Sequence, residues 1–236
     1  MKKAILFSLF LAPFFVFCQL QEGKIIFERK TNLFKKYTDK STQSYIKEEN
    51  KYRTEKFTLY FNDSMSVFIP EEKYERDRLE WTTNNNTVIN YLWRNETNTI
   101  YSFNGASIYV KDSLIQRSWK FTDKWRTICN IECMQAMYEV DDSTRIYAWF
   151  TSKITPEVGP ESFCQLPGAI LGLALEDGMV TYFATSVEET KLDMEEVLPK
   201  FNDKKAATRK EIIEKARKDF KFEKEIDRYF KEILMW

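Results

Sequence analysis

Residues 159–178 read GPESFCQLPGAILGLALEDG, and this stretch holds four of the six glycines in the chain. Glycine permits a positive φ or a close approach of two backbones, while proline fixes φ and removes a backbone donor. The stretch therefore predicts a tight loop over residues 159–168, an apolar strand over residues 169–175 and a turn at residues 176–178. An Asp-Gly pair between two strands favours such a turn on backbone grounds.

The Leu-Pro-Gly sequence at residues 166–168 predicts a type II turn at the end of this loop. Pro167 suits the second position of the turn, and Gly168 can take the positive φ that the third position needs. In the strand that follows, apolar residues occupy both faces. We therefore expect that strand to be buried on both sides.

Alternation of apolar and polar residues continues outward from this segment. Phe57, Leu59 and Phe61 share one face of a predicted strand, a turn follows at residues 62–64, and residues 65–69 are expected to return with their apolar side chains on the same face. Similar runs predict further strands at residues 24–29, 88–93, 99–103, 107–110, 116–121, 134–140, 145–151, 169–176 and 179–187.

These closely spaced strands have no amphipathic helices between them. That pattern predicts a mainly β fold over residues 19–190, formed as a curved antiparallel meander sheet or a partial barrel. Aromatic residues make up 16% of the chain, which suits a curved sheet with large side chains on its concave face.

The character of the sequence changes after residue 190. Thr208, followed three residues later by Glu211, forms a capping box, and apolar residues then recur at helical spacing almost to Trp236. We therefore expect residues 191–236 to form a helical C-terminal segment whose apolar stripe packs on the sheet.

Residues 1–18 have the features of a secretory signal peptide. Two lysines precede an apolar run that ends at Cys18 and is too short to span a bilayer comfortably. A lipoprotein anchor at Cys18 is the alternative, but the bulky Phe17 directly before it favours cleavage to a soluble chain that begins at Gln19. No second apolar stretch approaches membrane-spanning length, so we expect a periplasmic or secreted protein.

Composition excludes several classes of function. The chain has 36 Lys and Arg against 36 Asp and Glu, so it carries no net charge and no nucleic-acid footprint. It has no histidine, which excludes a Ser-His-Asp or Cys-His nucleophile and removes the commonest ligand for zinc and copper. We expect no cofactor and no histidine-based metal site, and any catalysis would depend on carboxylates, tyrosine, lysine or thiol.

Five motifs carry a resemblance to a known family. They are Cys133 on a strand, AWFT at residues 148–151, the Gly-Pro turn at residues 159–160, the Leu-Pro-Gly core at residues 166–168 and YFAT at residues 182–185. Together they resemble the GLPGLI family of exported proteins from Bacteroidota, over roughly residues 22–190. The chain departs from the family pattern at two positions, since Gln165 stands where a glycine is expected and Ala169 where a leucine is.

The resemblance implies a location and an architecture rather than a chemistry. Members of the family often accompany outer-membrane transport systems, which implies an accessory role beside such a transport protein. The loop is then the candidate site for a ligand or partner, with Gly159, Pro160, Glu161, Leu166, Pro167 and Gly168 as its residues. The alternative is that the loop is a structural clamp of the sheet with Leu166 in the core, and the apolar residues on both faces of the following strand favour this interpretation.

Three cysteines remain after the signal peptide. Cys133 is the one that recurs in the family, and we interpret it as a buried packing residue. Cys129 and Cys164 look like additions in this chain, and in an oxidising compartment we expect a disulfide between them that ties the loop to the neighbouring hairpin. Cys129 and Cys133 would be roughly 13 Å apart on an extended strand, beyond the reach of a disulfide unless the segment between them turns.

Three hypotheses of function follow. We favour a non-catalytic envelope protein that binds a partner or an apolar small molecule on its curved sheet. One alternative is an envelope hydrolase that uses Glu161 with Glu176 or Asp177 as paired carboxylates. The other is a Cu(I)-binding protein in which the three thiols act with Met134 and Met137.

Overall fold

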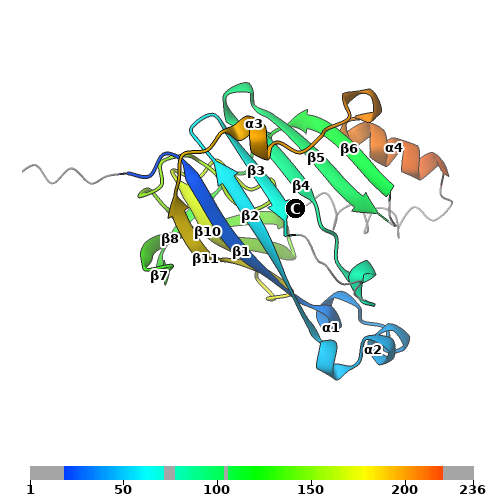
Figure 1. The fold of residues 1–236 in the computed structure, drawn as a ribbon. Coiled ribbons are helices and arrows are strands. Elements are labelled where there is room, and N and C mark those ends of the chain that lie inside the picture. Colours follow the sequence, from blue (N-terminus) through cyan, green and yellow to red (C-terminus); the bar gives the residue numbers. More distant parts are fainter. Residues whose placement is uncertain (1–18, 72–77, 104–105, 220–236) are drawn as a thin grey trace, which may run out of the picture.

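The computed structural model describes residues 19–71, 78–103 and 106–219, and its main feature is one antiparallel sheet of eleven strands. The strands are β1 (Gly23–Asn32), β2 (Tyr52–Phe61), β3 (Met65–Pro70), β4 (Thr87–Tyr91), β5 (Glu96–Phe103), β6 (Ala106–Ser113), β7 (Lys120–Ile128), β8 (Ile131–Asp141), β9 (Thr144–Thr151), β10 (Ala169–Leu175) and β11 (Val180–Glu189). Their order across the sheet is β6-β5-β4-β3-β2-β1-β11-β10-β9-β8-β7 (Figure 1). The predicted mainly β, antiparallel fold is confirmed.

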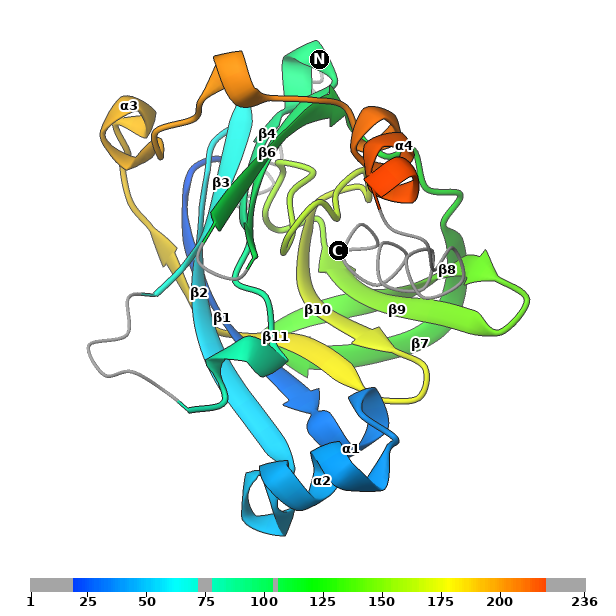
Figure 2. The same cartoon turned by 90° about the vertical axis from the view of Figure 1, so that its right-hand side faces the viewer.

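The sheet consists of two meanders, β1–β6 and β7–β11, that meet where β1 pairs with β11. The two outermost strands, β6 and β7, follow one another in the sequence and are joined by residues 114–119. A link of this length spans at most about 25 Å. The sheet must therefore curl strongly to bring its edges that close, and Figure 2 shows this curvature. It does not close, because β6 and β7 do not pair with each other.

The β2–β3 hairpin forms as predicted, but its faces are not the expected ones. Register pairs Leu59 with Phe68 and Phe61 with Ser66, and directly paired residues point to the same face. Phe68, rather than Val67, therefore shares the face of Phe57, and the two Phe rings stack with centroids 4.9 Å apart.

Residues 65, 67 and 69 point to the opposite, convex face of the sheet. They are covered there by helix α3 (Met194–Val197) and its neighbours, with Val67 and Met194 in one small apolar cluster. Both faces of β3 are thus apolar, and alternation alone could not assign them.

Strand β10 is buried along its whole length, which confirms the expectation of burial on both sides. On the concave face, Leu171 and Leu173 belong to the main core. On the convex face, a Cβ added to Gly172 would lie 2.8 Å from the Phe183 ring and 2.9 Å from Ile128. A side chain at this position would push the covering residues away.

The structure differs from the sequence prediction at one further strand and contains two helices that were not predicted. Residues 116–119 were expected to begin a strand, but they belong to the link between the edge strands, and β7 begins at Lys120. Helices α1 (Leu33–Lys36) and α2 (Lys40–Ile46) were not expected, because neither is long enough to show helical periodicity. Their caps were readable in the sequence, since the side chains of Asn32 and Asp39 accept hydrogen bonds from the first helical amides.

The C-terminal segment contains α3, a short 3-10 turn η4 (Asp203–Lys205) and helix α4 (Arg209–Asp219). The predicted capping box is formed, since Thr208 N donates to Glu211 Oε2 and Glu211 N donates to Thr208 Oγ1. Helix α4 lies beside β6 (Figure 1), where Arg209 N donates to Asp112 Oδ2 at 3.1 Å. The expected helical stripe beyond Asp219 and the signal peptide both lie outside the described residues.

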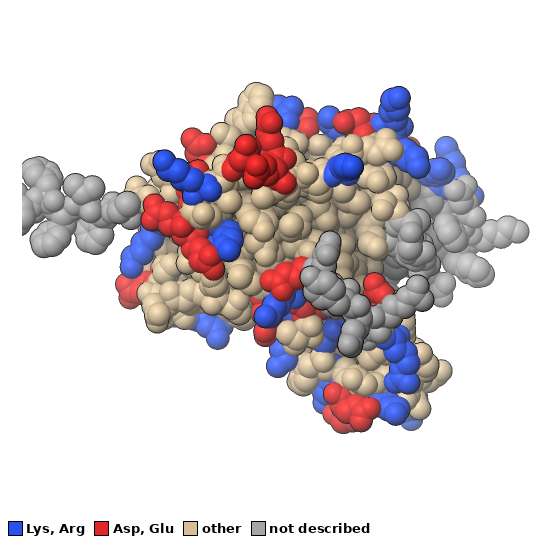
Figure 3. Space-filling model, in the orientation of Figure 1, with Lys and Arg blue, Asp and Glu red and all other residues tan. Residues whose placement is uncertain are grey.

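No helix in the described part of the chain is both long enough and apolar enough to cross a membrane. On the face seen in Figure 1, acidic and basic side chains are interspersed (Figure 3).

Candidate functional site

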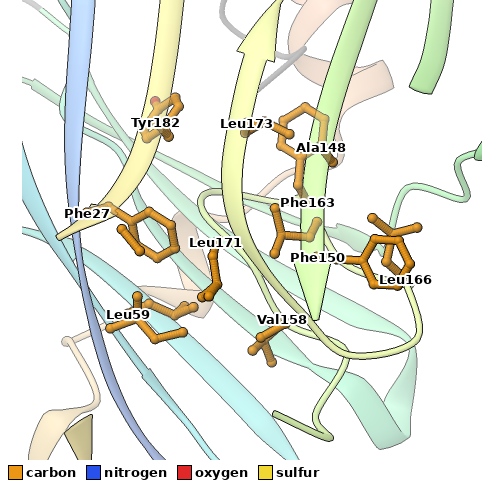
Figure 4. Close-up of a cluster of buried hydrophobic side chains, with 14 of the residues drawn as sticks. Phe27, Leu59, Ala148, Phe150, Val158, Phe163, Leu166, Leu171, Leu173 and Tyr182 are labelled. Carbon is orange, nitrogen blue, oxygen red and sulfur yellow. The ribbon is translucent and has the colours of Figure 1, made fainter. Parts of the chain in front are cut away.

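The loop singled out by the sequence lies inside the curve of the sheet. Residues 152–168, which we call the motif loop, connect β9 to β10. Val158 and Phe163 are fully buried and Leu166 is 1% exposed, all within the main apolar core that also includes Phe27 and Leu171 (Figure 4). The chain fills the concave side of its own sheet with this loop.

This placement bears on each residue of the candidate ligand or partner loop. Five of them are buried, namely Gly159, Pro160, Glu161, Leu166 and Gly168, and Pro167 is exposed. The motif loop therefore offers little surface to a ligand or partner in this conformation. Its main contribution is to the interior.

The turn at the end of the loop needs its glycine, although it is not of the expected type. Gly168 has a φ of +123°, and its N–H donates to Leu166 O at 2.7 Å, which closes a three-residue turn around Pro167. The N–H of Ala169, which would close a type II turn, donates to Ile154 O instead. A Cβ at Gly168 would lie 2.1 Å from Thr151 O, so both backbone conformation and space exclude a side chain.

Two further residues of the loop have a positive φ without being glycine. Gln165 adopts a φ of +69°, and Glu161 adopts +55°. Positive φ in a non-glycine residue carries a conformational cost, so the surrounding contacts must hold these residues in place. For Glu161 the structure shows those contacts.

Glu161 is completely buried and links the motif loop to both meanders. Tyr182 on β11 donates its hydroxyl to Glu161 Oε1 at 2.8 Å, and Asn86 Nδ2 lies 3.5 Å from Oε2. The backbone oxygen of Glu161 accepts from Asn90 Nδ2 at 3.2 Å. Arg29 Nη1 lies 3.9 Å from Oε1, at the limit of an ion pair.

Arg29 is the centre of a buried ion-pair cluster, which we define as Arg29, Arg53, Glu55 and Glu161. Register places Arg29 on β1 directly opposite Glu55 on β2, and Arg29 Nη2 pairs with Glu55 Oε2. Arg53 Nε pairs with Glu55 Oε1 at 3.0 Å. Each of the four residues is at most 7% exposed, and their formal charges balance.

Neutral groups add hydrogen bonds to the cluster. Arg29 donates to Asn84 O at 2.7 Å and to Asn85 Oδ1 at 2.9 Å, and Thr83 Oγ1 donates to Glu55 Oε1 at 3.0 Å. The Arg29 guanidinium also lies over the Phe57 ring, 4.7 Å from its centroid. Ionic groups in an interior are tolerated when they are paired and hydrogen-bonded in this way.

Burial shifts the acidities of this cluster. It raises the pKa of the Glu161 carboxyl from 4.5 to about 6, although the positive charge of Arg29 opposes the rise. Burial and the neighbouring Glu161 carboxylate raise the pKa of Tyr182 well above its ordinary value. Burial opposes the charge of Arg29, but Tyr182, Glu55 and Glu161 outweigh it, so the pKa of Arg29 is raised and this residue remains a cation.

The arrangement does not form a pair of catalytic carboxylates. Glu161 and Glu55 each approach a terminal nitrogen of the same guanidinium, that of Arg29, so both buried carboxylates face a cation. The predicted partners of Glu161 are elsewhere, because Glu176 and Asp177 are exposed at the turn between β10 and β11. There, Arg145 Nη1 donates to Glu176 at 3.1 Å.

A third buried arginine ties the motif loop to the link between the edge strands. Arg117, in residues 114–119, donates to Ser162 O at 2.8 Å and to Ser162 Oγ at 2.9 Å. Its guanidinium lies 3.9 Å from the centroid of the Phe163 ring. Burial lowers the pKa of Arg117 to about 10, so it remains charged at neutral pH.

The expected disulfide between Cys129 and Cys164 is not formed in this structure, where both residues and Cys133 are free thiols. Cys129 and Asn130 form the two-residue turn between β7 and β8, with φ values of +50° and +61°. Cys129 Sγ donates to Ala184 O on β11, whereas Cys164 is buried in the motif loop beside Arg117. The chain therefore turns directly after Cys129, which is the alternative that the sequence analysis set against an extended strand.

Copper binding gains no support from these positions. The described residues contain no group of three or more Cys, Asp or Glu side chains placed to hold a metal ion. Cys133 is fully buried, and burial raises the pKa of its thiol to about 12, which disfavours the thiolate that a metal would bind. Met134 and Met137 are half-buried on β8.

The sequence analysis identified Glu161 but missed the residues around it. A signal was present, because Arg29 follows Ile25 and Phe27 at alternate positions, and Glu55 precedes Phe57 in the same phase. Charged residues in phase with the apolar face of a strand must be buried or lie at its end. Here both are buried, at 5% and 3% exposure.

Comparisons with known proteins inform the fold. No family model matches the sequence, and no curated protein is similar to it. Among solved structures, the crystal structure of PNGF-II superposes with a TM-score of 0.55 at 16% sequence identity. The match covers 80% of this chain and 31% of PNGF-II, so the chain spans about a third of that protein's length and shares a fold with part of it.

Proposed function

We propose that the protein is an exported, non-catalytic accessory protein of the cell envelope that binds another protein through its outer surface. The observation that carries the proposal is the motif loop, which fills the concave side of the sheet where a ligand would otherwise sit. Export, and a partner in an outer-membrane transport system, are what the signal-peptide features and the GLPGLI resemblance imply.

The filled interior argues against an apolar carrier. A carrier needs an open, apolar cavity that buries most of its ligand. In this chain, Phe163, Leu166 and Val158 occupy the concave side together with side chains of the sheet. An acyl chain could enter only if the motif loop left the core.

The same geometry argues against a carboxylate hydrolase. A general acid must reach its substrate, whereas Glu161 is completely buried and is held by Tyr182 and Arg29. The raised pKa of Glu161 is explained by its burial in the core. No catalytic role of Glu161 is needed to explain the raised pKa.

The test is made on protein purified from its native envelope. Mass spectrometry of the native protein should find a mature chain that begins at Gln19 and carries no stoichiometric lipid. A panel of envelope glycans and peptides should remain uncleaved. Bound acyl chains would favour the carrier, and turnover lost in Glu161→Gln would favour the hydrolase.

A further inference from the structure

The surface best suited to a partner lies away from the sheet, on a projection that we call the knob. The knob comprises residues 33–51, which include α1, α2 and the 3-10 turn η1 (Glu48–Asn50), and residues 78–82, which include the 3-10 turn η2 (Glu80–Thr82). Figure 1 shows α1 and α2 projecting beyond one end of the strands. Leu33, Ile46 and Leu79 form a small buried core of its own, so the knob has a defined shape.

Three aromatic rings meet on the knob, and two of them are about half exposed. Trp81 is 49% exposed and Tyr45 is 51% exposed. Trp81 contacts the Tyr37 ring with centroids 5.4 Å apart and the Tyr45 ring at 6.2 Å. Large aromatic side chains are costly to leave in water, and a group of them exposed together is a candidate interaction surface.

The knob also presents positive charge beside these rings. The Arg78 guanidinium lies 5.3 Å from the centroid of Tyr45, and no described carboxylate pairs with it. The Lys36 ammonium lies 5.6 Å from the centroid of Tyr37. Trp, Tyr and Arg are the residue types that contribute most binding energy at protein interfaces.

The ring geometry distinguishes a protein partner from a polysaccharide. The planes of Tyr37 and Tyr45 are inclined to that of Trp81 by 58° and 50°. Rings tilted in this way form no flat platform on which a chain of sugar rings could stack. They form an uneven apolar surface suited to a side chain, with cations at its rim.

We propose that the knob is a docking surface for a protein segment that combines an apolar or aromatic side chain with neighbouring carboxylates. The apolar side chain would pack against Trp81 and Tyr45, and a carboxylate would pair with Arg78. This proposal rests on the proposed partner-binding function and specifies where the partner binds. Its electrostatic component should weaken as salt increases.

The experiment selects peptides from a random twelve-residue phage-display library on the purified protein. Selected peptides should contain an apolar or aromatic residue beside Asp or Glu. As synthetic peptides they should bind Trp81→Ala and Tyr45→Ala at least tenfold more weakly than the unmodified protein. Arg78→Ala should reduce both affinity and its dependence on salt.

Trp93→Ala is the matched control, because Trp93 is 72% exposed on a different 3-10 turn, η3 (Leu92–Arg94). It should leave the affinity within twofold. Circular dichroism and melting temperature establish whether each variant is folded. If Trp81→Ala does not fold, Arg78→Ala provides the test of the docking site.

Two results would overturn the docking site. One is selected peptides that bind Trp81→Ala and Arg78→Ala as well as they bind the unmodified protein. The other is binding of a soluble polysaccharide such as laminarin that depends on Trp81. Either result leaves partner binding elsewhere possible, whereas lipid in the purified protein or turnover of the glycan panel would overturn the proposed function itself.

Discussion

The two meanders of the sheet have different interiors. Buried side chains of β7–β11 are almost all apolar, including Ile146, Ala148, Phe150 and Leu173. The β1–β6 meander buries apolar residues together with many polar and charged ones, namely Arg29, Thr31, Asn32, Arg53, Glu55, Thr58, Ser66, Asn90, Thr97, Asn98 and Thr99.

This contrast explains what the motif loop does. Its apolar residues Phe163 and Leu166 pack in the main core, while Glu161 on the same loop enters the polar interior of the other meander. Apolar packing tolerates a change of partner, whereas a buried charge needs a specific partner of opposite charge. The apolar contacts therefore supply cohesion, and Glu161 and Arg29 determine how the loop sits on the β1–β6 meander.

The largest effect on the polar interior is expected from Arg29→Met. This substitution leaves Glu55 and Glu161 buried without their shared cation, and we expect a loss of about 3–5 kcal/mol in the free energy of unfolding. Urea unfolding measures it. The matched control is Lys30→Met on the same strand, where the side chain is exposed and the expected change is within about 0.5 kcal/mol. A loss below 1 kcal/mol for Arg29→Met would mean that the cluster does not hold the loop.

The apolar interior is tested by Leu166→Ala. Leu166 is 1% exposed, so truncation should cost about 2–5 kcal/mol through lost packing and a residual cavity. Pro167→Ala at the adjacent exposed position should cost less than about 1 kcal/mol. If Leu166→Ala instead left the melting temperature unchanged, the residue would be accessible to a partner after all.

The backbone of the loop is tested by Gly168→Val. A β-branched residue at this positive φ should cost about 1–3 kcal/mol, with the clash against Thr151 O added to it. Gly178→Val provides the comparison, since Gly178 also has a positive φ but a Cβ there would meet nothing within 4 Å. The Gly168 variant should be the less stable of the two in thermal unfolding. Equal losses would show that space at Gly168 is unimportant.

The charge state of Glu161 gives a pH-dependent difference. Its pKa is about 6 in the folded protein and near 4.5 when unfolded, so the folded state holds this proton more tightly. The stability that results is present below about pH 4.5 and is lost as the pH rises through about 6, a change of about 2 kcal/mol.

Glu161→Gln cannot titrate at this position. From pH 4.5 to 6.5, the free energy of unfolding of the unmodified protein should therefore fall relative to that of the variant. Parallel pH profiles of the two proteins would contradict the raised pKa.

The smallest expected effect on stability is that of Trp81→Ala. Half of this side chain is exposed and it lies outside both interiors, so we expect a loss of at most about 1 kcal/mol. Chemical denaturation measures the change. A loss of 3 kcal/mol or more would show that Trp81 belongs to the packing of the knob and is not available to a partner.

The same contrast separates what the sequence could predict from what it could not. Alternation identified most strands, and the run at residues 170–175 predicted burial on both faces, because apolar burial leaves a periodic pattern. The predicted face of Val67 was wrong. The turn between β2 and β3 sets the register that decides this face, and alternation does not reveal the register when both faces of a strand are apolar.

The site was predicted only in part. Glu161 was identified as a candidate, but its partners Arg29 and Asn86 come from β1 and from the segment before β4. No local pattern links such distant positions. The burial of Glu161 itself was not predicted, because the sequence of the loop gives no sign of the ion pair with Arg29 that allows its charge to be buried.

The pairing of β1 with β11 has a consequence for how the chain folds. It matches residue 25 with residue 187, whereas every other strand pair of the described sheet joins strands that follow one another in the sequence. Hairpins of each meander can form quickly from local contacts. The pairing of β1 with β11 joins residues that are far apart in the sequence, so it forms more slowly. Until this pairing forms, the edge of β1 that faces β11 exposes unpaired backbone groups, which favour aggregation. We therefore expect the docking of the two meanders, and not the formation of either, to limit the folding rate.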